Sequence, residues 1–165
     1  MKGLLKPETR RISDLLQGVN DAEFVLPRFQ RSFVWTKNQV VELLNSIYDQ
    51  IPIGVFLLWD SDQLGEAFRF IGDIVPPEAK PRRHSKYVLD GQQRLTSLLF
   101  ALRPENLHLP EAISSKYEIY FCIDDECFYG KRPDKKKVSP QVNWVRKINS
   151  LAFMQKPQRI TLLIS

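Results

Sequence analysis

The segment from Val88 to Leu98 holds the residues best suited to binding an anion. It reads V-L-D-G-Q-Q-R-L-T-S-L, which predicts a short strand, a glycine turn and a helix. We expect Asp90 to cap this helix, because Asp90 and Gln93 have the spacing of a capping box. The N–H groups of the first helical turn, Gly91–Gln93, would then lack helical partners. Together with the positive end of the helix dipole they would form an anion site.

The side chains of the same segment extend this chemistry. Gln92 and Gln93 would add amide donors, and Arg94 carries a planar fork suited to phosphate oxygens. Asp90 would accept a hydrogen bond from a ribose hydroxyl or help to hold a cation. Arg94 falls on the polar side of an apolar helical stripe, so we expect that its loss would spare the fold. The alternative is a well-capped helix whose polar side chains simply face solvent.

A second segment, L-P-R-F-Q-R-S-F-V-W at 26–35, combines two arginines, a glutamine and three aromatic residues. This mixture suits phosphate contact by Arg28 and Arg31 together with base stacking. We expect Phe33 and Trp35 to pack into the core instead. Gln30 and Arg31 are predicted to belong to a site.

The charges of the chain are unevenly distributed. There are 24 Lys and Arg residues against 19 Asp and Glu residues, a formal net charge of +5. Basic clusters of this kind are typical of partners that carry phosphates, such as DNA. The alternative is that both clusters are solvated loops. The two clusters comprise Lys80, Arg82, Arg83, His84 and Lys86, and Lys131, Arg132, Lys135, Lys136 and Lys137. Among them, the candidate DNA contacts are Arg82, Arg83, Lys135 and Lys136.

Composition predicts one globular domain over residues 1–165, since 43% of the residues are hydrophobic and no linker or repeat interrupts them. No apolar run approaches the roughly 20 residues that span a bilayer, and the first ten residues do not form a secretory signal. We therefore expect a cytoplasmic protein without membrane contact. Cys122 and Cys127 are predicted to be reduced thiols, because their spacing fits no C-x-x-C or zinc pattern.

Periodicity predicts short strands interleaved with helices, which indicates an α+β fold with a small mixed sheet flanked by helices. One helix is expected to be capped by Thr36 and Gln39, and another, over Ile12–Gln17, to be opened by Ser13 or Asp14 and stopped by Gly18. The expected helices cover 12–17, 36–48 and 91–102, and the expected strands cover 24–26, 55–59, 67–71, 87–89 and 117–123. Pro27 is expected to end the first of these strands, and the continuous apolar run at 55–59 predicts a buried strand.

Three ordered motifs together resemble the N-terminal domain family of GmrSD-type restriction enzymes. They are L-P-R-F-Q-R-S-F-V-W at 26–35, I-P-I-G-V-F-L-L-W at 51–59 and V-L-D-G-Q-Q-R-L-T-S-L at 88–98. Members typically show I-P-x-F-Q-R-x-Y-x-W, a Y-P-I-G segment and D-G-Q-Q-R in this order. The resemblance covers about residues 10 to 125. The chain departs from the pattern by apolar exchanges only, at Leu26, Phe33 and Ile51.

The resemblance implies a ParB/sulfiredoxin-like fold and a role in defence against phage DNA with modified bases or a modified backbone. Several members hydrolyse nucleoside triphosphates through the D-G-Q-Q-R region and thereby control a DNA nuclease. When the roles of the family motifs are carried over to this chain, the candidate catalytic residues are Asp90, Gln92 and Arg94. The candidate nucleotide ligands are Gln30, Arg31, Asp90, Gly91, Gln92, Gln93 and Arg94. Mg²⁺ would accompany the triphosphate, with Asp90 as its candidate ligand.

We expect the C-terminal nuclease domain of many members to be absent from this chain, and we therefore expect no independent DNA cleavage. Its expected partners are modified foreign DNA and a nuclease domain or subunit. One alternative is a non-catalytic DNA-binding or regulatory domain, in which the D-G-Q-Q-R turn contacts a backbone phosphate without turnover. Another is a structural remnant that has lost both activities.

Overall fold

The computed structural model describes residues 5–60, 68–76, 85–102, 104, 107–134, 138–139 and 159–164. The four candidate DNA contacts Arg82, Arg83, Lys135 and Lys136 lie outside these described residues. Within them, no helix is both long enough and apolar enough to cross a membrane.

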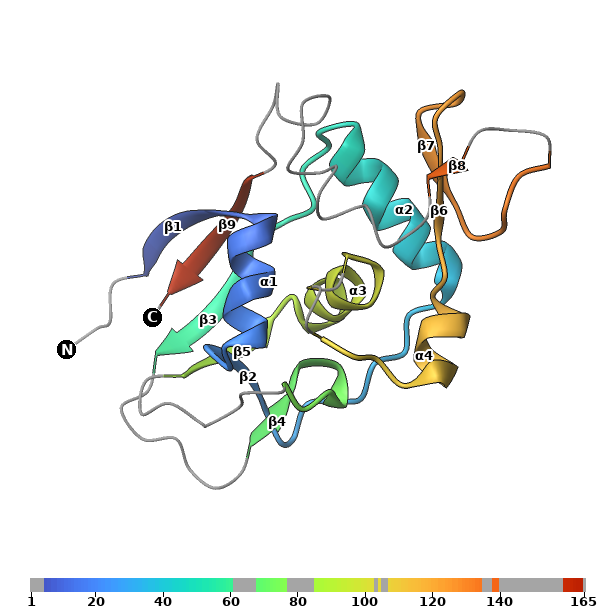
Figure 1. The fold of residues 1–165 in the computed structure, drawn as a ribbon. Coiled ribbons are helices and arrows are strands. Elements are labelled where there is room, and N and C mark those ends of the chain that lie inside the picture. The colour runs from blue at the N-terminus through green and yellow to red at the C-terminus, as the bar shows by residue number, and fades with distance from the viewer. Residues whose placement is uncertain are drawn as a thin grey trace.

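A six-stranded mixed sheet forms one side of the molecule (Figure 1). Two of its neighbouring strand pairs are parallel, β9 with β3 and β5 with β2, and the other three pairs are antiparallel. The sheet thus mixes both ladder types, as an α+β fold predicts. Its order is β1 (Lys6–Arg11), β9 (Arg159–Ile164), β3 (Phe56–Asp60), β5 (Lys86–Asp90), β2 (Phe24–Pro27) and β4 (Phe68–Phe70).

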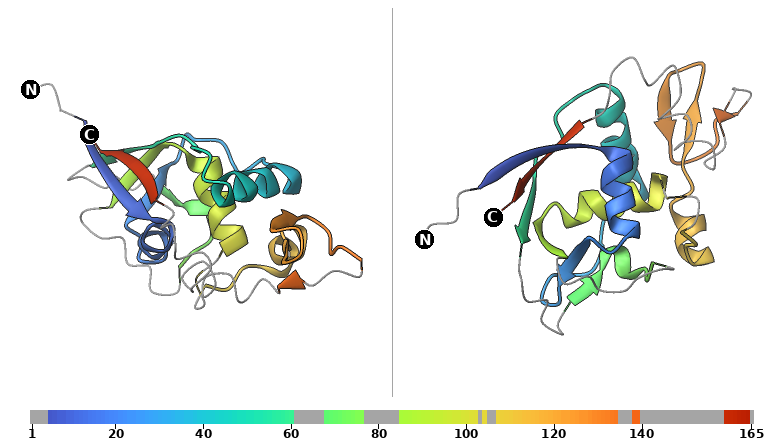
Figure 2. Two further views of the ribbon diagram at one scale, coloured as in Figure 1. Left: turned by 90° about the horizontal axis from the view of Figure 1, so that it is seen from above. Right: turned by 60° about the vertical axis from the view of Figure 1, so that its left-hand side comes forward.

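The helices and a smaller sheet complete the fold. The helices are α1 (Ile12–Asn20), α2 (Lys37–Tyr48), α3 (Gln92–Leu102), α4 (Glu111–Lys116) and a short 3-10 helix, η1 (Ile71–Asp73). The smaller sheet has the order β7 (Cys127–Tyr129), β6 (Tyr120–Cys122) and β8 (Val138–Ser139). Figures 1 and 2 show α3 at the centre, with the large sheet on one side and α2 with the smaller sheet on the other.

Helix α3 is the centre of the hydrophobic core. Every residue from Leu95 to Leu102 is buried, including the polar Thr96 and Ser97. The sequence predicts a one-sided apolar stripe, but the structure surrounds this helix because it lies between two layers. The ring of Phe33 packs edge-on against Phe100, with 5.2 Å between the centroids, so the core position predicted for Phe33 is confirmed.

The capping box predicted for α2 is present. The Thr36 hydroxyl accepts a hydrogen bond from the Gln39 backbone N–H, and the Gln39 side chain accepts one from the Thr36 backbone N–H.

The predicted end of α1 is wrong, because that helix begins at Ile12 and continues through Gly18 to Asn20. At Gly18 a Cβ atom would lie 2.5 Å from the Phe24 ring, so this glycine serves close packing instead of ending the helix.

Two further strand predictions need correction. Strand β3 alternates, with Phe56 and Leu58 buried while Trp59 is exposed and stacks on Tyr87, so it is not buried on both faces. The strand expected over 117–123 is limited to β6, because α4 extends almost to its start. Cys122 and Cys127, both free, lie opposite each other in the hairpin of β6 and β7.

An ion cluster ties the N-terminal strand to the middle of the large sheet. The Glu23 carboxylate accepts hydrogen bonds from Arg10 Nη1 (2.8 Å) and Lys86 Nζ (3.1 Å). Arg10 also pairs with Glu8 and lies over the Phe24 ring. Burial by itself would raise the pKa of Glu23, but the hydrogen bonds from Arg10 and Lys86 outweigh it and lower this pKa below its ordinary value of 4.5.

We predict that Glu23→Gln lowers the free energy of unfolding by about 1 to 3 kcal/mol at neutral pH, because two cations lose a charged acceptor. The pKa of Glu23 is lower in the folded chain than in the unfolded chain. Its contribution is therefore complete above the unfolded pKa and is lost as the pH falls through the folded pKa. In urea denaturation, the difference in stability between parent and variant should begin to narrow below pH 4.5 and close as the pH falls through the folded pKa of Glu23.

The control for this experiment is Glu42→Gln, which neutralises an exposed carboxylate on α2. It should leave the dependence of stability on pH unchanged. A difference between the parent and Glu23→Gln that persists undiminished in acid would show that the Glu23 charge does not stabilise the fold.

Candidate functional site

The turn between β5 and α3 is made by Gly91 alone. Its φ is +94°, and a Cβ at this position would lie 2.5 Å from the Phe56 ring. Helix α3 begins at Gln92, and the Leu95 N–H donates to the Gly91 carbonyl (2.9 Å). The N-cap role predicted for Asp90 is therefore wrong, because Asp90 is the last residue of β5 and lies one position too early.

The loop after β2 is held against β5 by a side chain. The ladder between the two strands joins only Phe24 and Val25 of β2 to β5, and Pro27 has no N–H to continue it. The Gln30 amide replaces the missing donors. Its Nε2 donates to the carbonyl of Val88 (2.7 Å) and to that of Leu89 (3.0 Å).

The two glutamines of D-G-Q-Q-R hold the same loop from the other side. Gln92 Nε2 donates to the Arg31 carbonyl (2.7 Å), and Gln93 Nε2 donates to the Ser32 carbonyl (3.2 Å). Gln93 Oε1 also accepts from the Val34 N–H (2.9 Å). The amides that the sequence predicts as ligand donors are thus hydrogen-bonded within the protein. Their observed role is to join the two motifs.

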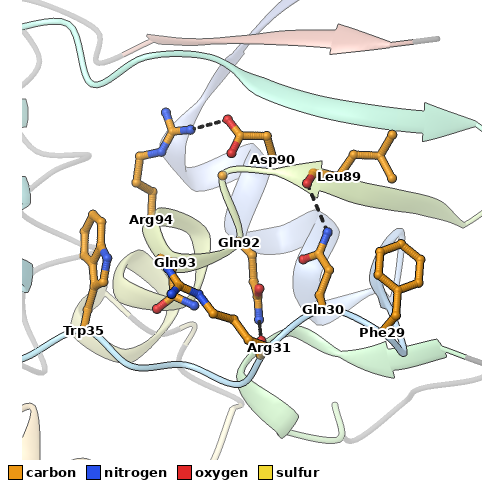
Figure 3. A pocket seen from close by; sticks show the side chains of 10 residues that line it. Phe29, Gln30, Arg31, Trp35, Leu89, Asp90, Gln92, Gln93 and Arg94 are labelled. Carbon is orange, nitrogen blue, oxygen red and sulfur yellow. Dashed lines mark hydrogen bonds and ion pairs between the residues drawn. The ribbon is translucent and has the colours of Figure 1, made fainter.

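These contacts create one open pocket with a volume of about 450 Å³. It is lined by Phe29, Gln30, Arg31, Trp35, Leu89, Asp90, Gly91, Gln92, Gln93 and Arg94, so the predicted convergence of Gln30, Arg31 and Arg94 on one pocket is observed. Figure 3 shows Phe29 and Leu89 together at one end and Trp35 at the other. Phe29 is 85% exposed. Arg28 is also exposed, beside the pocket lining.

Arg94 is bound into the protein more tightly than the sequence predicts. Its Nη1 donates to the Ile53 carbonyl (2.6 Å), and its Nη2 donates to Asp90 Oδ2 (2.9 Å). The guanidinium also lies over the Phe56 ring, 5.0 Å from its centroid. The side chain is only 17% exposed. The expectation that Arg94 can be lost without cost to the fold therefore needs correction, because Arg94 links α3 to the segment before β3.

Several groups of the pocket keep free hydrogen-bonding capacity. Among the described residues, the backbone N–H groups of Gln92, Gln93 and Arg94 have no hydrogen-bond acceptor, as is usual in the first turn of a helix. The Arg31 side chain is exposed beside them. Asp90 is 69% exposed and pairs with Arg94. Three or more His, Cys, Asp or Glu side chains do not cluster as a metal site anywhere in the described part of the chain.

Sequence reasoning missed Arg69 of β4. Its guanidinium donates to the carbonyls of Gln30 (2.8 Å) and Arg31 (3.2 Å) and to Ser32 Oγ (3.3 Å). The signal in the sequence is weak, a single arginine between Phe68 and Phe70. Since side chains alternate along a strand, Arg69 points to the opposite face from both rings.

Arg94→Ala should lower the free energy of unfolding by about 2 to 3 kcal/mol. The change leaves the Ile53 carbonyl without its donor and removes the cation–π contact with Phe56. Urea denaturation measures this difference. The matched control is Arg31→Ala, an exposed arginine of the same pocket, which should change stability by less than about 0.5 kcal/mol. Equal stability of the two variants would contradict a structural role for Arg94.

Two comparisons relate this chain to known proteins. MJ0686, an uncharacterized protein of Methanocaldococcus jannaschii, is 36% identical over 109 residues, which make up 64% of this chain. That matched region is only 19% of MJ0686, so the chain spans about a fifth of the relative's length. The family model of the GmrSD restriction endonuclease N-terminal domain matches residues 12–161. The chain therefore belongs to the family of GmrSD restriction endonuclease N-terminal domains.

Proposed function

We propose that the pocket binds the phosphates of a nucleoside triphosphate and that the domain serves a modification-dependent restriction system which acts on foreign DNA. The observation that carries this proposal is the convergence of three features. The open N–H groups of the first turn of α3 and the exposed Arg31 are suited to phosphate oxygens. The exposed ring of Phe29 offers a planar surface to a base.

Membership in the family supports the wider part of the proposal, a role in a restriction or defence system. DNA is the proposed substrate, and a nuclease domain or subunit is the proposed partner that would cut it. The assignment of the fold to the ParB/sulfiredoxin-like group belongs to the same proposal. It rests on the resemblance of the D-G-Q-Q-R turn.

Asp90 fits the role of a Mg²⁺ ligand beside a bound triphosphate. Mg²⁺ is commonly held by one or two carboxylates, with water and phosphate oxygens completing its shell. The Asp90 carboxylate is mostly exposed and uses Oδ2 for Arg94. A bound Mg²⁺ would neutralise phosphate charge. The residues of the chain would hold and orient the phosphates, which is the larger part of phosphoryl-transfer catalysis.

Thermal unfolding with ATP, GTP, CTP or UTP, each with Mg²⁺, tests nucleotide binding. At a ligand concentration of 100 times Kd, binding adds about 2.7 kcal/mol of stability, which raises Tm by about 5 to 10 °C. We expect at least one nucleotide to do so for the parent and for Arg11→Ala, which removes an exposed arginine of β1 outside the pocket. Arg31→Ala should lose most of this shift.

Two outcomes would contradict nucleotide binding at this pocket. In the first, none of the four nucleotides raises the Tm of the parent. In the second, Arg31→Ala retains the full shift, which would place the bound phosphates elsewhere on the protein. Phe29→Ala tests the contact with the base. Loss of base stacking should weaken the binding of nucleotides and leave the binding of inorganic triphosphate unaffected.

A second candidate function is DNA binding without turnover, in which the same turn contacts a backbone phosphate. The observation that favours it is the scarcity of acidic groups in the pocket lining. Asp90 is the one carboxylate among the lining residues, and it is already paired with Arg94. Such a site can hold a phosphate but has little capacity to hold several metal ions.

DNA binding is tested by the salt dependence of affinity for a duplex. The logarithm of the binding constant should fall linearly with the logarithm of salt concentration, with a slope of about −0.9 for each phosphate contact. Combined replacement of Arg28 and Arg31 by alanine should therefore flatten the slope by about two units. The same logic applies to Arg82, Arg83, Lys135 and Lys136. Slopes equal to that of the parent would remove these residues from the proposed DNA interface.

A further inference from the structure

Arg69 contacts the same pocket loop that Gln92 and Gln93 of α3 hold. One terminal nitrogen, Nη2, donates to both the Gln30 and the Arg31 carbonyl, and the other donates to Ser32 Oγ. These residues lie 37 to 39 positions earlier in the chain, so the contacts are tertiary. The nearest carboxylate is that of Asp73, 3.6 Å away and half exposed. Most of the polar contacts of Arg69 are thus made to the loop itself.

The Arg31 carbonyl joins two segments of the site. It accepts hydrogen bonds from Gln92 of α3 (2.7 Å) and from Arg69 of β4 (3.2 Å). The backbone of the loop is therefore fixed between a helix and an edge strand. The side chains of Phe29 and Arg31, from this same loop, line the pocket (Figure 3).

Arg69 is well suited to this task. A guanidinium presents several donors in a fixed plane, which allows one side chain to bond three acceptors of a loop at once. Its Nε is buried and has no hydrogen-bond partner among the described residues. An unsatisfied buried donor carries a cost, and the loop contacts of the two terminal nitrogens must offset it.

We propose that Arg69 is a positioning residue of the pocket, which orders loop 28–34 so that Phe29 and Arg31 face the ligand. The segment F-R-F of β4 would then be a third component of the site, beside the loop and the D-G-Q-Q-R turn. The ordering of the loop is inferred from the hydrogen bonds of Arg69 alone. Its effect on ligand affinity rests on the proposed anion-binding function.

The test compares Arg69→Met with Arg10→Met. Arg10 is a matched control, because its side chain is 20% exposed against 25% for Arg69, and it bonds carboxylates outside the pocket. The first measurement is hydrogen–deuterium exchange of the peptide that covers 28–34. In that peptide the N–H groups of Gln30 and Val34 are hydrogen-bonded and will report on loop order.

We expect exchange in 28–34 to rise in Arg69→Met and to stay at the parent level in Arg10→Met, with α1 equally protected in both. The second measurement is the affinity for inorganic triphosphate by calorimetry. Side chains that are no longer ordered in advance must be ordered on binding, which for two of them corresponds to about a tenfold weaker affinity. Arg69→Lys keeps the charge without the fork and should show an intermediate loss.

Unchanged exchange in 28–34 of Arg69→Met would overturn the proposal whatever the ligand. An affinity loss of equal size in Arg10→Met would also overturn it, since general destabilisation would then explain both variants. If the parent binds no triphosphate while the loop of Arg69→Met exchanges faster, the proposed anion-binding function fails and the positioning of the loop by Arg69 is supported.

Discussion

The positive φ of Gly91 is the constraint on which the pocket depends, because it turns a core strand into a core helix within one residue. Val88 of β5 and Leu95 of α3 are both fully buried, so neither element can shift to relax the turn. A side chain at position 91 would also collide with the buried ring of Phe56. The position of the first turn of α3 is therefore fixed, and its N–H groups are available to the pocket that the other lining residues surround.

Neutral amides hold the loop of this pocket to β5 and α3, beside the guanidinium groups of Arg69 and Arg94. Gln30, Gln92 and Gln93 each use a side-chain amide to satisfy backbone groups that no regular ladder reaches. Gln92 is buried, and a charged residue there would carry a large desolvation cost without a counter-ion. An amide can also donate and accept at once, as Gln93 does with Ser32 and Val34. Because these amides bond the backbone of the loop, the exposed guanidinium of Arg31 is left to contact a ligand.

Features that depend on neighbours in sequence could be predicted from the sequence, and those that depend on distant partners could not. The capping box of Thr36 and Gln39 and the end of β2 at Pro27 are local, and the structure contains both. The predicted helix end at Gly18 failed because the ring of Phe24 packs on it. The predicted freedom of Arg94 failed because its acceptor, the Ile53 carbonyl, lies 41 positions away. Arg69 was missed for the same reason, since nothing near it in sequence indicates the loop that it contacts.

The same long-range contacts explain why three separated motifs occur together in this chain. The loop of 26–35 is bonded to Gln92 and Gln93, and the segment of 51–59 is bonded to Arg94 through the Ile53 carbonyl. At Gly54, whose φ is +87°, a Cβ would lie 2.5 Å from Arg94 Nη1. The glycine of I-P-I-G therefore leaves the space that the arginine of D-G-Q-Q-R occupies, and neither residue could change alone without disturbing the other. The motifs at 26–35 and 51–59 thus both depend on three consecutive side chains in the first turn of α3, which makes the three motifs parts of a single packing unit.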